Sequence, residues 1–136
     1  MIRTHKVVLA NGCFDLLHWG HVQHLKAARK LGDVLIVGLT RDRSVKKGPG
    51  RPVFNEMQRA EMLEPYVDSV VLVDSSLEAL QRVDPDVFVK DREYAGKILA
   101  EDMAYCEARG IEIAFTTELK FSSTELLGHY ARLRES

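Results

Sequence analysis

Short apolar runs alternate with amphipathic stretches along almost the whole chain, and this alternation restricts the fold more than any other feature of the sequence. Five runs have the length and β-branched composition of strands. They are residues 6–10, 34–39, 70–73, 87–89 and 111–115. Strands that are apolar on both faces are typical of a parallel sheet with helices on each side. We therefore predict a doubly wound α/β domain built on a five-stranded parallel sheet.

The stretches between these runs have the signatures of helices. Residues 21–31 place apolar side chains at helical spacing and end at Gly32. Asn55 with Gln58, and Ser75 with Glu78, have the three-residue spacing of capping boxes, in which each side chain bonds a backbone N–H of the other residue. Further helices are expected from Asn55 to before Pro65, from Ser75 to near Val83, from about Lys97 to Gly110, and from Ser122.

Size and charge exclude several classes of protein. The chain has 136 residues, which suits one domain over residues 1–136. A net charge of −1 argues against a nucleic-acid partner, because such proteins are normally basic. Cys13 and Cys106 have no paired spacing and are expected to be reduced core thiols. Since no apolar run is long enough for a signal peptide or a membrane span, we expect a cytoplasmic protein without a membrane partner.

The stretch NGCFDLLHWGH, residues 11–21, follows the first strand and opens the first helix. Ligands in such sheets bind at the carboxyl ends of the strands, and a helix N-terminus favours phosphate. Gly20 would let the backbone approach a ligand, and His18 and His21 could donate hydrogen bonds to phosphate oxygens. The alternative is that a histidine here is a helix cap or a surface residue. His24 is expected to be solvated, and these histidines are not expected to bind a metal, because they fan around the helix without a further ligand in register.

The same stretch resembles the His-x-Gly-His signature of the nucleotidyltransferase superfamily, whose fold is Rossmann-like. Together with GRPVFNEMQRAEML and DPDVFVKDREY it resembles the adenylyltransferase domain of ADP-heptose synthases. FDLLHWGH and the EYAGK region are also similar to glycerol-3-phosphate cytidylyltransferases. The resemblance extends from about Val7 to Leu127. It implies that a substrate phosphate attacks the α-phosphorus of a nucleoside triphosphate and releases pyrophosphate, with no protein nucleophile.

The resemblance also implies roles for individual residues. His18 and His21 would stabilise the α-phosphate and the departing pyrophosphate, together with a loop lysine, which is Lys46 or, in an equally plausible register, Lys47. Asp15 would fix the loop rather than act as a base. The nucleotide-binding residues implied near the first strand are Asn11, Gly12, Cys13, Phe14 and Gly20.

Further residues are implied at the other loops. Asp42 and Arg59 would bind the acceptor, although a turn residue and a solvated helix arginine are the alternatives. Lys90 and Glu93 would contact the nucleotide or the acceptor, and Tyr94 could stack on a base. The heptose-type pattern differs here, because it has Gly in place of Asp91 and Asp in place of Glu93.

The last helix start completes the implied site. Ser122, Ser123 and Thr124 match a segment that holds the β- and γ-phosphates, although SSTE is also a good capping box. Cytidylyltransferases have an arginine where Thr117 stands, and Lys120 is the nearest cation, which weakens the assignment to that subfamily.

We therefore expect adenylyl transfer from ATP to a heptose 1-phosphate-like sugar phosphate. A glycerol-3-phosphate-type cytidylyltransferase is the alternative enzyme, and a non-catalytic nucleotide-binding module is the alternative from another class. By the resemblance, Mg²⁺ would be bound mainly through the triphosphate rather than by a protein cage, and the protein would be a homodimer.

Overall fold

A five-stranded, fully parallel sheet forms the centre of the computed structural model, which describes residues 4–116. The strand order is β3-β2-β1-β4-β5. The strands are β1 (Val7–Gly12), β2 (Val34–Thr40), β3 (Ser69–Val73), β4 (Val87–Asp91) and β5 (Glu112–Thr116). The predicted fold class is confirmed, and all five predicted strands are present.

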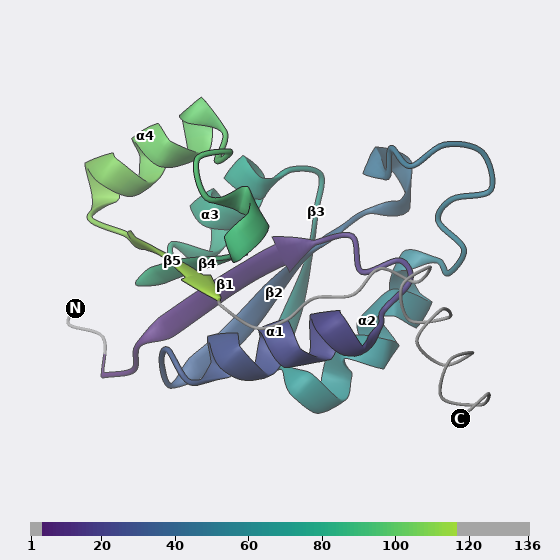
Figure 1. The fold of residues 1–136 in the computed structure, drawn as a ribbon, viewed down its shortest axis with the longest axis horizontal. Coiled ribbons are helices and arrows are strands. Elements are labelled where there is room, and N and C mark those ends of the chain that lie inside the picture. The colour runs from purple at the N-terminus through teal and green to yellow at the C-terminus, as the bar shows by residue number, and fades with distance from the viewer. Residues whose placement is uncertain (1–3, 117–136) are drawn as a thin grey trace, which may run out of the picture.

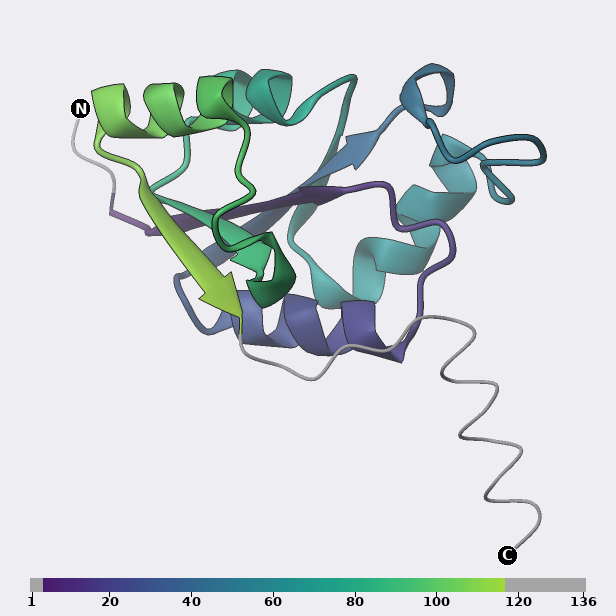
Figure 2. The same cartoon turned by 45° about the horizontal axis from the view of Figure 1, so that its top comes forward.

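Within residues 4–116, four α-helices cover the two faces of the sheet (Figures 1 and 2). α1 (Trp19–Arg29) and α2 (Glu56–Leu63) lie on one face, and α3 (Ser76–Val83) and α4 (Ala100–Arg109) lie on the other. Three short 3₁₀ turns complete the described elements: η1 (Asp42–Ser44), η2 (Glu64–Tyr66) and η3 (Arg92–Tyr94). No helix within residues 4–116 is long and apolar enough to cross a membrane.

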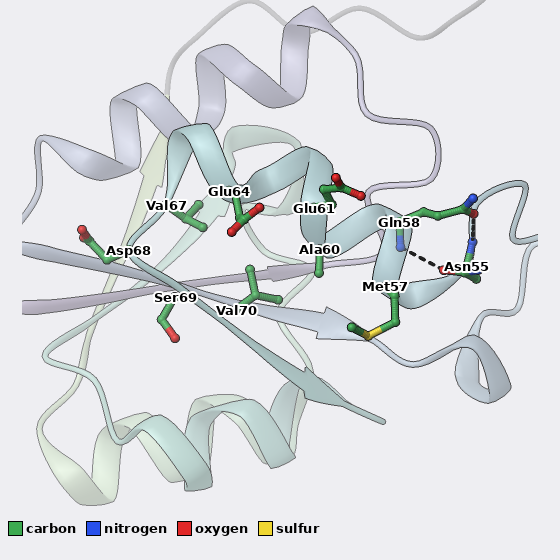
Figure 3. Close-up of a pocket in the computed structure, with 10 residues that line it drawn as sticks. All are labelled: Asn55, Met57, Gln58, Ala60, Glu61, Glu64, Val67, Asp68, Ser69 and Val70. Carbon is green, nitrogen blue, oxygen red and sulfur yellow. Dashed lines mark hydrogen bonds between the residues drawn. The ribbon is translucent and has the colours of Figure 1, made fainter.

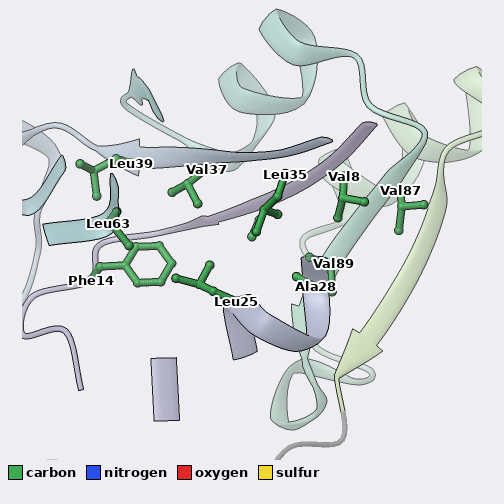
Figure 4. Close-up of a cluster of buried hydrophobic side chains, with 11 residues drawn as sticks. Val8, Phe14, Leu25, Ala28, Leu35, Val37, Leu39, Leu63, Val87 and Val89 are labelled. Atoms are coloured by element: carbon green, nitrogen blue, oxygen red, sulfur yellow. The ribbon is translucent and has the colours of Figure 1, made fainter. Parts of the chain in front are cut away.

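Alternation along the central strands builds a hydrophobic core on each face. Val8 and Ala10 of β1 pack with Leu25 of α1 and Leu63 of α2 in the larger cluster (Figure 4). Leu9, between them in sequence, points to the opposite face and joins the cluster under α3 and α4. Because successive strand side chains point to opposite faces, the continuous apolar run predicted from the sequence fills both cores at once.

The helix ends agree with the capping signals in most cases. Asn55 and Gln58 form the predicted reciprocal capping box at the start of α2, and Gly110, with φ of 70°, ends α4. Ser75 caps α3, but the Glu78 carboxylate accepts instead from the backbone N–H of Asp74.

Two helix predictions differ from the structure or fall outside it. α4 begins at Ala100 rather than at about Lys97, because η3 occupies part of the chain between β4 and the helix. The helix expected from Ser122 lies outside the described residues.

The direction of winding reverses between β1 and β4, and this reversal positions the site. The chain moves from β1 through β2 to β3, then crosses back to β4 on the other side of β1. The loops that follow β1 and β4 therefore diverge at the carboxyl edge of the sheet, which is where ligands bind in such folds. Gly38 of β2 permits close packing there, because a Cβ at this position would lie 2.7 Å from Cβ of Ala79 in α3.

Candidate active site

A cavity of about 220 Å³, called the first cavity below, opens at this reversal point. Its wall combines the loop after β1, the start of α1, the loop after β2 and the end of β4. The lining residues are Asn11, Gly12, Cys13, Phe14, His21, His24, Lys47, Val89, Lys90, Asp91 and Tyr94. Five of the predicted nucleotide-binding residues meet here: Asn11, Gly12, Cys13 and Phe14 from the end of β1 and the loop after it, and Lys90 from β4.

Two histidines cap the start of α1 with their own side chains. His18 is the N-cap, and its Nδ1 accepts from the backbone N–H of Gly20 over 3.1 Å. His21 Nδ1 accepts from the backbone N–H of His18 over 3.2 Å. The two rings stack with their centroids 3.8 Å apart and an interplanar angle of 21°. The alternative interpretation of His18 as a cap is confirmed, and it is compatible with a role in phosphate binding.

These two hydrogen bonds determine which ring nitrogen carries the proton. A nitrogen that accepts a hydrogen bond from a backbone N–H is unprotonated. The neutral rings of His18 and His21 therefore carry their proton on Nε2, the nitrogen farther from the backbone. An Nε2–H group can donate to a phosphate oxygen at the positive end of the helix dipole.

Phe14 packs against the ring of His21. Its ring meets that of His21 edge-on, with centroids 5.2 Å apart, and the side chain is buried in the core shown in Figure 4. Phe14 has a φ of 51°, which few residues other than glycine adopt. Backbone strain of this kind is often found at functional sites, where the surrounding structure maintains it.

Asp15 joins the loop after β1 to the loop after β2. Its buried carboxylate accepts from Arg51 Nε over 2.7 Å and from the backbone N–H groups of Val53 and Phe54. Burial opposes ionisation of this carboxyl, but these hydrogen bonds and the arginine charge outweigh burial and lower its pKa below the usual value. The structure agrees with the expectation that Asp15 fixes the loop. The guanidinium of Arg51 therefore donates both to the carboxylate and to the backbone carbonyl oxygen of Asp15.

The loop lysine at the first cavity is Lys47. Its Nζ donates to the carbonyl oxygen of Asp15 over 3.0 Å, and it lines the cavity. Lys46 does not line the cavity, so Lys47, the second of the two registers left open by the sequence, is the one placed at it, and the catalytic role of the loop lysine stays a prediction. Neighbouring side chains of a non-helical chain project in different directions, and sequence similarity cannot resolve a shift of one residue in such a loop.

Arg59 is placed differently from both sequence expectations. Its side chain has no exposed surface, so it is neither a solvated helix residue nor open to an acceptor phosphate. Its guanidinium donates over 2.7–2.9 Å to the carbonyl oxygens of Cys13, Thr40 and Phe54 and to the Asp42 carboxylate. Arg59 thus ties together the loop after β1, the end of β2 and the loop between β2 and α2. Asp42 is partly exposed, and its role toward the acceptor stays a prediction.

The end of β4 contributes a cation, an acid and an aromatic ring. Lys90 Nζ lies 4.5 Å from the centroid of the Tyr94 ring, and both residues line the first cavity. Asp91, the residue that replaces a glycine of the heptose-type pattern, also lines it and caps η3 by accepting from the backbone N–H of Glu93. The Glu93 side chain is exposed and does not line the cavity. Thr117, Lys120 and Ser122–Thr124 lie outside the described residues.

His24 is buried, contrary to the expectation of a solvated residue. Its Nδ1 lies 2.9 Å from Oγ1 of Thr116 at the end of β5, and His24 lines the first cavity. A signal was present in the sequence, because His24 lies four residues before Ala28 and shares its buried helix face. Within residues 4–116 no group of three or more His, Cys, Asp or Glu side chains lies close enough together to hold a metal ion.

A larger hollow of about 570 Å³ lies between α2 and β3 (Figure 3). Ser69 and Val70, in its wall, are at the amino end of β3, away from the carboxyl edge where ligands bind in this type of sheet. Glu61, Glu64 and Asp68 also line it, and none of its ten lining residues is basic. Because this lining repels a triphosphate, the first cavity is the better candidate for the active site.

The family assignment follows from a comparison with known families. A family model described as cytidylyltransferase-like matches residues 9–125, which include both sides of the first cavity. The chain belongs to the cytidylyltransferase-like family. The predicted resemblance to the nucleotidyltransferases is confirmed, and this cytidylyltransferase-like chain is a nucleotidyltransferase.

Individual relatives agree with the family. The chain is 46% identical over 120 residues to the bifunctional protein HldE of Campylobacter jejuni subsp. doylei, covering 82% of this chain and 26% of that protein. It is 44% identical over 110 residues to HldE of Syntrophotalea carbinolica, covering 73% of this chain and 22% of that protein. The chain thus spans about a quarter of the length of the curated relatives it matches.

A solved structure shows the same fold. The lipopolysaccharide core biosynthesis protein of Thermoplasma volcanium superposes with a TM-score of 0.69 at 28% identity, covering 87% of this chain and 99% of that chain. A more distant likeness concerns the fold alone. Thermotoga maritima TmcAL, solved with alpha-thio ATP, gives a TM-score of 0.60 at 16% identity, covering 96% of this chain and 51% of that chain.

Proposed function

We propose that this chain transfers an adenylyl group from ATP to a heptose 1-phosphate-like sugar phosphate. An oxygen of the acceptor phosphate attacks the α-phosphorus, and the bond from the α-phosphorus to the bridging oxygen of the β-phosphate breaks. Pyrophosphate leaves with that oxygen, and the product is a nucleoside diphosphate sugar. The acceptor phosphate is already anionic, so no protein nucleophile is required.

The stacked imidazole pair is the observation that carries this proposal. His18 and His21 both use Nδ1 to cap α1, which leaves the proton on each Nε2 in the neutral rings. Two such donors at a helix N-terminus suit the negative charge that develops on the α-phosphate and the departing pyrophosphate. The helix start holds both rings before any substrate binds, so little reorganisation is needed during the reaction.

Cations around the first cavity support a polyanionic ligand. Lys47 and Lys90 both line it, one from the loop after β2 and the other from β4. Positive charge from both can hold the triphosphate and align its α-phosphorus with an incoming phosphate. We assign Lys47 the role that the resemblance gave to a loop lysine.

ATP and a sugar phosphate are proposed on the basis of relatives. The 46% identity to an HldE protein extends over most of this chain, and a lipopolysaccharide core biosynthesis protein shares its fold. Mg²⁺ would be held mainly by triphosphate oxygens and would neutralise part of their charge. The Asp91 carboxylate in the cavity wall would supply an oxygen ligand of the kind that Mg²⁺ prefers. We further propose a cytoplasmic homodimer.

A pyrophosphate-release panel tests this function. It crosses ATP and CTP with heptose 1-phosphate and glycerol 3-phosphate, in the presence of Mg²⁺. We expect release with ATP and heptose 1-phosphate. Release with CTP and glycerol 3-phosphate alone would replace both substrates but leave the reaction class, and no release with any pair would favour a non-catalytic nucleotide-binding module. When variants of His18 or His21 are assayed in this panel, His5→Ala is the matched control, because it removes an exposed imidazole away from the cavity.

A further inference from the structure

A second cavity, of about 280 Å³, adjoins the first one on the face of the sheet that α3 and α4 cover. The two cavities share Asn11, Lys90 and Tyr94, so they meet at the reversal point between β1 and β4. The remaining residues that line the second cavity are Ser76, Lys97, Ile98, Leu99 and Asp102. None of the catalytic residues proposed above lines it.

Asp102 brings an unpaired carboxylate oxygen to the second cavity. The residue is 3% exposed, and Ser76 Oγ donates to its Oδ2. No group within residues 4–116 donates to its Oδ1. The Oδ1 of Asn11 lies in the shared wall and is also buried. No group within residues 4–116 donates a hydrogen bond to it. An unpaired buried acceptor costs folding free energy, so its retention calls for an explanation, and a ligand that supplies the donor provides one.

The lining defines the chemistry of that ligand. Two unpaired oxygens require N–H or O–H donors on the ligand. Lys90 and Lys97 in the same wall favour a ligand that also carries negative charge. A phosphorylated polyol has both features, because its hydroxyl groups can donate and its phosphate is anionic.

The geometry of the reaction separates the acceptor from the leaving group. In a phosphoryl or nucleotidyl transfer the attacking and leaving oxygens lie roughly in line on opposite sides of the phosphorus. His21 and Lys47, which would hold the departing pyrophosphate, line only the first cavity. The attacking phosphate then approaches from the second cavity, across the shared wall, with the rest of the acceptor inside it.

We infer that Asp102 determines acceptor specificity by accepting a hydrogen bond from a hydroxyl group of the phosphorylated acceptor, with Asn11 accepting a second one. The inference rests on the proposed function, because it assigns the acceptor of the same reaction. Asp102 contacts the acceptor away from the reacting phosphorus, and its removal weakens acceptor binding rather than the chemical step.

Steady-state kinetics with the active substrate pair test this role. Asp102→Ala is expected to raise the acceptor KM about 10- to 100-fold, as for loss of a hydrogen bond to a charged group, and to leave the nucleotide KM unchanged. Asp102→Asn keeps the size of the side chain and is expected to have a Tm close to that of the parent. Glu101→Ala, at an exposed position in the same helical turn, is the control and should change neither KM. A rise in the nucleotide KM alone, or equal rises in both with a lower Tm, would overturn the inference.

A binding arm separates this inference from the proposed function. Calorimetric titrations without nucleotide compare heptose 1-phosphate, glycerol 3-phosphate and inorganic phosphate. We expect the parent to bind one of the polyol phosphates at least about 10-fold more tightly than inorganic phosphate, and Asp102→Ala to lose that difference. If no pair releases pyrophosphate, the proposed function fails while this arm still decides the role of Asp102. Equal binding of all three phosphates to the parent would refute it.

Discussion

Arg51 Nε donates to the Asp15 carboxylate over 2.7 Å, and this ion pair joins the loop after β2 to the loop after β1. The Asp15 side chain is completely enclosed, whereas Arg51 is about one third exposed. The same carboxylate accepts hydrogen bonds from the backbone N–H groups of Val53 and Phe54. One side chain therefore positions the part of the loop that leads into α2. Lys47 lies in this loop, and its Nζ donates to the backbone carbonyl oxygen of Asp15.

Removing the Asp15 carboxylate is expected to destabilise the protein. Asp15→Ala leaves two backbone N–H groups and part of a guanidinium without their acceptor, and each unpaired buried group costs about 1–3 kcal/mol. Urea denaturation should show a lower free energy of unfolding, and the nucleotide KM should rise because Lys47 loses its support. Glu61→Ala, at an exposed position on α2, is the control. Unchanged stability would contradict the anchoring role.

The same carboxylate predicts a dependence of stability on pH. The pKa of Asp15 is lower in the folded protein than its usual value near 3.8. Its stabilising contribution is therefore fully present above that value and is lost as the pH falls through the lower, folded-state pKa. The difference in unfolding free energy between the parent and Asp15→Asn should shrink as the pH falls below about 4. A difference that stays constant from pH 7 to pH 2 would show that ionisation of Asp15 contributes nothing.

Two substitutions at His21 separate its structural role from its chemical one. The Oδ1 of asparagine can replace Nδ1 as the acceptor for the His18 backbone N–H, but asparagine has no counterpart of Nε2. His21→Asn should therefore be more stable than His21→Ala. Both variants should reduce turnover about 100-fold or more, as when one preorganised donor is lost. Thermal unfolding and pyrophosphate release measure the two effects. Near-normal turnover of either variant would contradict the role of the Nε2–H group.

Arg59 is expected to behave as a structural residue. Lysine cannot reproduce the planar set of donors that binds three carbonyl oxygens and the Asp42 carboxylate. Arg59→Lys should therefore lower the free energy of unfolding by about 3 kcal/mol in the absence of any substrate. If the variant is as stable as the parent and only its acceptor KM increases, the buried arrangement does not describe the protein in solution.

The two cysteines should differ in reactivity. Burial raises the pKa of the Cys106 thiol, and the Asp102 carboxylate adds to this shift, so little thiolate forms at neutral pH. Cys13 is partly exposed and lines the first cavity. Iodoacetamide should label Cys13 first, and ATP should slow that labelling. Mass spectrometry of parent and Cys13→Ser protein identifies the modified residue, and rapid labelling of Cys106 in the folded chain would contradict the prediction.

Local sequence signals are sufficient to predict the helices and strands of the fold and to suggest a phosphate-binding site. Apolar runs, capping residues and the position of Gly110 act over a few residues, and they predict the strands and most helix ends. Phosphate binding at the start of α1 follows from the same local signals and stays a prediction. His18 and His21 can be placed at that helix start for the same reason, because both lie within one turn of it. The amino-acid sequence alone therefore makes the loop after β1 a candidate site.

Long-range packing decides which distant side chains join that site. Arg59 is buried because the loop after β1, the end of β2 and the loop before α2 converge on it, and His24 is buried because β5 ends beside α1. Lys47 reaches the first cavity while its Nζ donates to the backbone carbonyl oxygen of Asp15, 32 residues earlier in the chain. Asp102 gives no local signal, since its unpaired oxygen has meaning only where α4 and the end of β1 line the same cavity. Such contacts depend on the strand order and helix packing of the whole domain, so a pattern of a few neighbouring residues cannot predict them.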